Sequence, residues 1–327
     1  MRYRFLVVVG TACAMGLICP ISTSAQSTRT AANTATRGWS PSHLPDGQPD
    51  IQGTWTNYDN TPFQAPSPED DRALEALRGW FPPGDQTGPG SVWGTDGPLD
   101  ASRNPRRKAM VVDPESGRVP LRPEAAAKKD SALAHLTDSW ENHTPWERCI
   151  TRGIPAGIFP GGYGAGYRIV QAPGLVVIYY EMIHETRIIP VNGSPHLPAS
   201  VHQWNGDSRG RWEGNTLVVD VTNYNDKGSI ATNIASQAMR GIGQSEQLHV
   251  VERFTITDAN TLNYEATIDD PHVYTRPWKI AIPLSRDSKY ELYEYACHEG
   301  NRALPNTLSV ARALEKKAAE GSAQKPK

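Results

Sequence analysis

The stretch QLHVVERFTITDANTLNYEATIDDPHVY (Gln247–Tyr274) alternates apolar and polar side chains on both sides of a short polar segment. A period of two is typical of a β-strand with one apolar and one polar face. The segment Asp258–Asn260 favours a turn, so the stretch predicts an antiparallel hairpin. The sequence does not show which face lines the interior: one face of the second strand carries Leu262, Tyr264, Ala266 and Ile268.

Neighbouring segments carry the same pattern. YRIVQAPGLVVIYYEMIHETRIIPVNG (Tyr167–Gly193) predicts three strands, and RGRWEGNTLVVDVTNY (Arg209–Tyr224) predicts a hairpin that turns at Glu213–Asn215. RPWKIAIPLSRDSKYELYEYACHEG (Arg276–Gly300) predicts a last hairpin whose second strand is Tyr290–Cys297. No long helical period separates these strands, which argues against parallel βαβ units. We therefore predict a mainly β protein, an antiparallel meander that closes into a lipocalin-like barrel, since closure removes unpaired edges.

The N-terminus has the features of a secretory signal peptide. Two arginines precede an apolar run that ends near Ile18, and small residues lead to a cleavage site after Ala25. The run is too short to span a bilayer comfortably. We therefore expect a periplasmic or secreted protein with no membrane span once the signal is removed.

The remaining chain of about 300 residues predicts four further segments. Ser, Thr, Ala and Asn dominate the first of them, which suggests a disordered linker. A long loop and helix segment follows, with short helices in Pro66–Trp80 and Arg122–Trp140. The predicted segments are the linker 26–45, an N-terminal wrapping segment 46–150, the barrel 151–305, and a C-terminal helix with a charged tail 306–327.

Charge and cysteine content narrow the class of protein. The formal net charge of −2 gives no electrostatic footprint for nucleic acid. Two of the four cysteines lie in the signal peptide, so the mature chain keeps Cys149 and Cys297. In an oxidising compartment the simplest prediction is a disulfide between them, the alternative being a reactive thiol at Cys297.

Two resemblances add to this interpretation. Gly53-Thr54-Trp55 is similar to the G-x-W pattern on the first strand of lipocalin-like barrels, where the Trp closes one barrel end and packs under an Arg. The segments GDSRGRWEGNTLVVDVTNY (Gly206–Tyr224) and YEYACHEGN (Tyr293–Asn301) resemble a large family of exported bacterial proteins of unassigned function. The second resemblance covers most of the mature chain. It implies a shared fold and export, and it assigns no reaction.

Polar residues at predicted strand ends and in one long loop supply the candidate site. Acid–base chemistry needs a proton donor and an acceptor beside the substrate, and arginines can hold a carboxylate or phosphate. The long loop Gly193–Gly210 adds further candidates for ligand contact. The candidate catalytic residues are Glu181, His184, His298 and Glu299, and the candidate ligand contacts are Arg187, His202, Trp204, Asp207, Arg209 and Arg211.

We expect no cofactor. A zinc, iron or manganese site would use His184, His272 and His298 with nearby carboxylates, but the chain has no H-x-H or H-E-x-x-H motif. Two functions remain open. The first is an exported barrel that binds a small organic molecule. The alternative is an exported hydrolase, lyase or isomerase that acts at the barrel rim on a carbohydrate or an aromatic compound.

Overall fold

The structure is a computed structural model that describes residues 39–57, 61–65, 67–68, 107–160, 164–230 and 241–323. The predicted signal peptide and most of the predicted linker lie outside these residues. The predicted helix Pro66–Trp80 also lies outside them, apart from Ser67 and Pro68.

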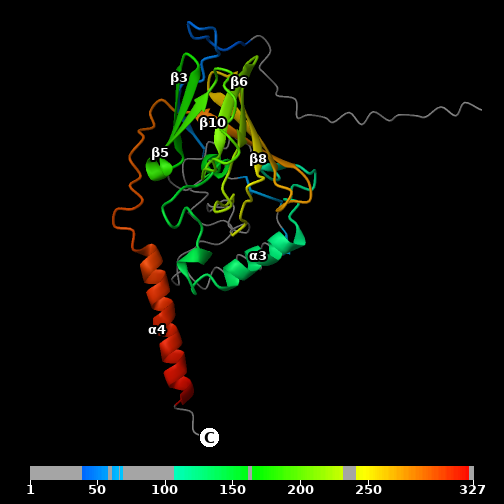
Figure 1. The fold of residues 1–327 in the computed structure, drawn as a ribbon. Helices are drawn as coiled ribbons and strands as arrows, with labels where there is room; N and C mark the ends of the chain where they lie inside the picture. Colours follow the sequence, from blue (N-terminus) through cyan, green and yellow to red (C-terminus); the bar gives the residue numbers. More distant parts are fainter. Residues whose placement is uncertain are drawn as a thin grey trace, which may run out of the picture. The chain divides into compact units, whose positions relative to one another are not determined.

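One antiparallel sheet forms the body of the described chain (Figure 1). Nine of its strands follow one another in the order β5-β4-β3-β1-β10-β9-β8-β7-β6, and a tenth, β2, pairs with β10. The bounds are β1 Gly53–Thr56, β2 Val111–Asp113, β3 Gly166–Ala172, β4 Leu175–Tyr180, β5 Glu185–Pro190, β6 Asp207–Glu213, β7 Thr216–Thr222, β8 His249–Asp258, β9 Thr261–Asp269 and β10 Trp278–Arg286.

The two ends of this path, β5 and β6, come together and nearly close a barrel. A Cβ atom built on Gly210 of β6 would lie 2.6 Å from Val191 Cγ1 and 2.9 Å from Ile189 Cγ2. Arg187 of β5 also donates to Ser208 of β6 across the same seam. The predicted antiparallel barrel is therefore confirmed.

In β8, β9 and β10 the mainly apolar face lines the barrel interior, which answers the question that the sequence left open. In β9 the inward residues Leu262, Tyr264 and Ile268 have no exposed surface. The side chain of Trp55 is also fully buried, its indole N–H donates to Ile51 O at 2.9 Å, and the Arg286 guanidinium lies 4.3 Å from the centre of its ring. Large side chains thus fill the barrel, so that burial of apolar surface supplies most of its stability.

Two α-helices and several single-turn 3₁₀ helices lie outside the sheet in the described chain. The predicted helix after Arg122 is confirmed as α3 (Pro123–Ala134), which begins with Pro at its first position. The C-terminal helix α4 (Ala303–Ala323) starts slightly earlier than predicted. The described residues also form three single-turn 3₁₀ helices in connections, namely η1 Trp140–Asn142, η2 Ala156–Ile158 and η3 Met182–His184. None of the helices in the described part of the chain is long and apolar enough to cross a bilayer.

The prediction of a strand at Tyr290–Cys297 is wrong. This segment has no strand pairing and runs as irregular chain into a turn at Cys297. The reason is that β10 has no free edge left, because β9 occupies one side and β1 and β2 share the other. The tyrosines of this segment are therefore loop side chains, and Tyr293 is 66% exposed. The place beside β10 belongs to β1, which joins β10 to β3.

Candidate functional site

Glu185, the first residue of β5, lies at one end of the barrel and directly follows a sharp turn. Ile183 and His184 have positive φ angles of 62° and 44°, a conformation that non-glycine residues rarely adopt. This turn places Glu185 at the barrel end and Arg187 on the same strand face, two residues further along. Unusual backbone of this kind is a reason to look for function in its neighbourhood.

Arg187 belongs to an interior cluster with Ser208, Glu252 and Tyr264. Its guanidinium donates to Ser208 Oγ at 3.0 Å and 2.9 Å and to Glu252 Oε2 at 2.5 Å. The other carboxylate oxygen of Glu252 accepts from Tyr264 Oη at 2.8 Å. The side chains of Arg187 and Glu252 are 5% and 0% exposed, so this ion pair is cut off from water.

Burial and charge keep this cluster in one protonation state. Burial alone lowers the pKa of Arg187, but the adjacent Glu252 carboxylate outweighs it, and the pKa lies above its ordinary value. Burial, reinforced by the charge of Glu252, raises the pKa of Tyr264. Arg187 therefore stays charged and Tyr264 stays a hydroxyl donor at physiological pH.

Two polar atoms beside the ion pair lack regular hydrogen bonds. Among the described residues, neither Arg187 Nη1 nor the Tyr180 hydroxyl has a hydrogen-bond partner that satisfies normal geometry, although the two groups adjoin each other. Such buried donors cost about 1–3 kcal/mol each when they remain unsatisfied. The interior cluster, with the adjoining Tyr180 hydroxyl, is therefore a polar and charged group inside a mainly apolar barrel.

A second group, the mouth cluster, lies at the start of β5 and consists of Thr151, Glu185 and Asn205. Thr151 Oγ1 lies 3.0 Å and 2.8 Å from the two carboxyl oxygens of Glu185, and Asn205 Nδ2 donates to the same carboxyl. Burial raises the pKa of Glu185, and the two neutral partners and Arg187 only partly oppose this shift. A partly buried carboxyl with a raised pKa is typical of groups that handle protons or bind ligands.

The predicted ligand contacts separate into three places. Arg187 points into the barrel, whereas Asp207, Arg209 and Arg211 lie in the outward phase of β6. His202 and Trp204 belong to the loop between β5 and β6, and His202 Nδ1 lies 2.9 Å from Tyr224 O. The structure therefore does not gather these six residues at one point.

The four predicted catalytic residues are also spread out. Glu181 is buried and accepts from Tyr290 Oη at 2.6 Å, whereas His184 is exposed and its Nδ1 lies 3.1 Å from Tyr295 O. His298 and Glu299 are exposed in the turn after Cys297. Within the described chain, no hydrogen bond or ion pair joins one of these four side chains to another.

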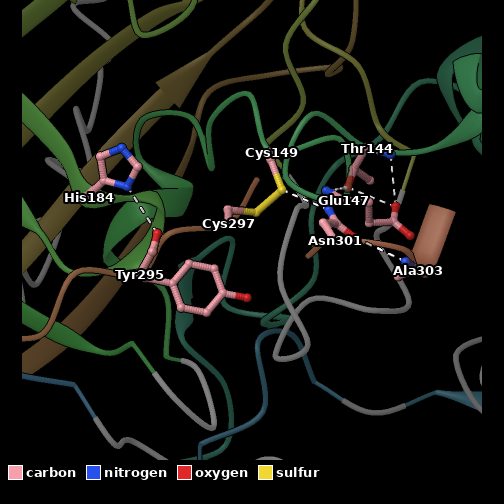
Figure 2. The surroundings of a disulfide bond; sticks show 8 residues. All are labelled: Thr144, Glu147, Cys149, His184, Tyr295, Cys297, Asn301 and Ala303. Carbon is pink, nitrogen blue, oxygen red and sulfur yellow. Dashed lines mark hydrogen bonds between the residues drawn. A yellow bond between two sulfur atoms is a disulfide. The ribbon is translucent and has the colours of Figure 1, made fainter. Parts of the chain in front are cut away.

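Cys149 and Cys297 form the predicted disulfide (Figure 2). The bond joins positions that are 148 residues apart, and such a long loop corresponds to about 4–5 kcal/mol in the chain-entropy account. The side chain of Asn301 points toward this bond, with Nδ2 2.9 Å from Cys149 Sγ, and its Oδ1 accepts from the first residue of α4, Ala303, at 3.2 Å. The disulfide therefore fixes the irregular segment that precedes α4.

Sequence reasoning missed Glu185 and Glu252 as site residues. Glu252 carried a usable signal, because it occupies the apolar phase of β8 between Val250 and Phe254. Glu185 carried a weaker one, as a carboxylate at a predicted turn. Thr151 had no signal at all, since only the fold brings it to Glu185.

In the part of the chain that the structure describes, no group of three or more His, Cys, Asp or Glu side chains is arranged to hold a metal ion. His272, one of the three histidines that the sequence suggested for a metal site, is exposed. The described residues therefore offer no ligand set from which to argue a metal site.

Comparison with known proteins gives no further assignment. No protein-family model matches the chain, and no curated protein and no solved structure matches it either. The site must therefore be interpreted from its own geometry.

Proposed function

We propose that this chain is an exported β-barrel protein that binds a small organic ligand at the mouth cluster, with Arg187 behind it. The observation that carries the proposal is the setting of Glu185. Its carboxyl is partly buried and has a raised pKa. Its hydrogen-bond partners, Thr151 and Asn205, are neutral, whereas a buried carboxylate with a purely structural role normally pairs with a cation.

The interior cluster supports the same location. Glu185 and Arg187 share a strand face, and Arg187 forms an ion pair with Glu252. A ligand that contacts Glu185 would therefore lie next to this ion pair. The filled apolar barrel below would act as a rigid base for such a site, because interiors packed in this way do not deform easily. Export is supported by the disulfide, which is typical of oxidising compartments.

A thermal-shift screen of small organic acids, amines, sugars and phenols tests the proposal. A ligand at 100 times its Kd stabilises the native state by about 2.7 kcal/mol, which is readily measured as a higher Tm. We expect at least one compound to raise the Tm of the wild-type protein and of Glu213→Gln, a matched change at an exposed carboxylate of β6. The same compound should not raise the Tm of Glu185→Gln.

Two outcomes contradict binding at the mouth cluster. One is a screen in which none of these compound classes changes the Tm. The other is an equal shift in Glu185→Gln and wild type, which would place the ligand elsewhere on the protein.

The raised pKa of Glu185 also favours the second candidate, an exported hydrolase, lyase or isomerase. A general acid or base works best when its pKa is moved toward the working pH, and burial moves Glu185 in that direction. In this case the wild type and Glu213→Gln should convert the compound found in the screen into a product, and Glu185→Gln should not. Mass spectrometry of the compound after incubation with each protein separates binding from turnover.

A further inference from the structure

The mouth cluster has more close contacts between polar atoms than an ionised Glu185 could fill with hydrogens. Thr151 Oγ1 lies 3.0 Å and 2.8 Å from the two carboxyl oxygens of Glu185 and 3.0 Å from Asn205 Oδ1. A hydroxyl donates one hydrogen, and an ionised carboxylate donates none. If Thr151 donates to an ionised Glu185, two bare oxygen atoms face each other at Asn205. If it donates to Asn205, the same happens at Glu185.

A proton on Glu185 completes a closed ring of hydrogen bonds. Glu185 Oε2 then donates to Thr151 Oγ1, Thr151 donates to Asn205 Oδ1, and Asn205 Nδ2 donates to Glu185 Oε1. The backbone N–H of Gly153 also donates to Thr151 Oγ1, at 3.0 Å. The Thr151 hydroxyl thus uses its hydrogen and both of its lone pairs.

This proton count is the same for both orientations of the Asn205 amide. If its nitrogen and oxygen exchange places, Asn205 donates to Thr151, Thr151 donates to Glu185, and Glu185 must donate to Asn205. The ring then runs in the opposite sense. In either sense it needs three hydrogens, of which Thr151 and Asn205 supply two, so the third belongs to Glu185.

The charges around the ring leave room for a neutral acid. Burial raises the pKa of Glu185, and Arg187 opposes this shift, but Glu252 pairs with the Arg187 charge. The cross-strand neighbour of Glu185 on β4 is Tyr180, which burial keeps neutral. Other ionisable side chains within three residues of the ring in sequence have contacts of their own, namely Arg148 with the Trp140 ring, Arg152 with Phe159 O, His184 with Tyr295 O, His202 with Tyr224 O and Asp207 with Arg209.

A neutral Glu185 decides which charge a ligand can bring. The charges of Arg187 and Glu252 cancel, so the mouth cluster and the ion pair behind it have no net charge. An ammonium group would find no free carboxylate there, and an organic acid would meet a cation that is already paired. Either ion would lose hydration without gaining an opposite charge, whereas a hydroxyl group needs only hydrogen bonds.

The protonated carboxyl also offers a ligand an acceptor. Its hydroxyl oxygen keeps a lone pair after it donates to Thr151, and a ligand hydroxyl can donate to that lone pair. Gln at position 185 could copy the ring through its amide, but its second N–H would occupy the place of this lone pair. Glu185→Gln should therefore keep the ring and lose the ligand.

We propose that the mouth cluster holds Glu185 as a neutral carboxylic acid in a ring with Thr151 and Asn205, and that it binds an uncharged ligand that carries hydroxyl groups. The class of ligand rests on the proposed function, whereas the proton on Glu185 does not.

Carbon-13 NMR of the full chain, labelled at the glutamate carboxyl carbons, tests the ring. The signal that disappears in Glu185→Gln belongs to Glu185. At about pH 6, well above the ordinary pKa of a glutamate, it should have the chemical shift of a protonated acid. The matched control is the signal that disappears in Glu213→Gln, which should be that of a carboxylate, because hydrogen bonds from two arginines lower the pKa of Glu213.

A carboxylate signal for Glu185 at this pH overturns the ring. If Glu185→Gln does not fold, the conservative variant Glu185→Asp removes the same labelled carbon and identifies the signal. A wild-type spectrum without any protonated glutamate carboxyl at this pH overturns the ring without a variant.

The thermal-shift screen, run at the same pH, tests the class of ligand. We expect the compounds that raise the Tm through Glu185 to be sugars or phenols. An amine or an organic acid that raises the Tm of the wild type but not of Glu185→Gln overturns the ligand class and leaves binding at the mouth cluster intact. A protonated Glu185 in a protein that binds none of the compounds contradicts the proposed function and leaves the ring intact.

Discussion

The interior cluster and the outer clasp both join nitrogen groups to carboxylates, but their surroundings differ. The outer clasp is the group of side chains in contact on the outer wall of the barrel, namely His196, Asp207, Asp220 and His249. Arg187 and Glu252 are 5% and 0% exposed, whereas Asp220 of the clasp is 32% exposed. Buried charges interact strongly, and a buried charge without a partner is strongly destabilising, whereas water screens charges near the surface. The comparison teaches that burial decides how strongly such a contact stabilises the fold and how much water and salt weaken it.

Breaking the interior pair should have the largest effect. Glu252→Gln leaves the Arg187 charge buried without its partner, which should lower the free energy of unfolding by about 3–5 kcal/mol. Urea denaturation measures this change. Added salt should barely alter it, because screening ions do not reach the interior.

A double variant sharpens this result. Arg187→Met combined with Glu252→Leu removes both charges and should recover most of the lost stability, since paired replacement of buried ions by apolar groups is often tolerated. A loss in the double variant as large as in Glu252→Gln would show that packing, not charge, dominates at this position.

The change Glu185→Gln should have an effect on stability that is intermediate in size and depends on pH. Its pKa in the folded protein is raised above the ordinary value of 4.5, so the native state holds this proton longer than the unfolded chain. Its contribution is therefore fully present below the ordinary pKa and is lost as pH rises through the raised one. Denaturation midpoints over about pH 4 to 8 should fall less with rising pH in Glu185→Gln than in the wild type, and by a smaller energy than the interior pair costs.

Glu213 gives a control of opposite sign. Hydrogen bonds from Arg253 and Arg211 lower the pKa of Glu213, so its contribution is present above the ordinary pKa and is lost as pH falls. Glu213→Gln should therefore change the acid side of the profile. A Glu185→Gln profile that resembles this control would mean that Glu185 is an ordinary surface carboxylate.

The smallest effect on stability is expected at the outer clasp. Asp220→Asn removes one charge between two histidines and should cost about 0.2–1 kcal/mol, as exposed ion pairs usually do. High salt should reduce the difference between this variant and the wild type, unlike in the interior. A cost that salt does not change would indicate that the clasp acts through packing.

The sequence predicted the barrel well because its signal is local. Alternation in Gln247–Tyr274 and in Tyr167–Gly193 needs only neighbouring residues, and both stretches form the predicted strands. The prediction failed at Tyr290–Cys297, where alternation is present but no sheet edge is free. Whether a strand finds a partner is a property of the whole fold.

The candidate site was harder to predict because it depends on contacts between distant positions. The sequence could identify Arg187 as an arginine able to bind a ligand, but not that Glu252 neutralises it. Thr151 and Asn205 meet Glu185 only after the barrel closes. The sequence suggested His298 and Glu299 as catalytic residues, yet both are exposed. The nearby Tyr290 donates to the buried Glu181 instead.

The position of β1 between β3 and β10 has a consequence for the order in which the chain folds. β1 forms near residue 55, but its two neighbours come from residues 166–169 and 285–286. Contacts between positions so far apart in the sequence form slowly, because closing the long loop between them costs conformational entropy before the contacts can stabilise the chain. One edge of β1 therefore stays unpaired until nearly all of the polypeptide is present. A chain that ends before Ser285 would expose this edge, and other chains could pair with it and aggregate.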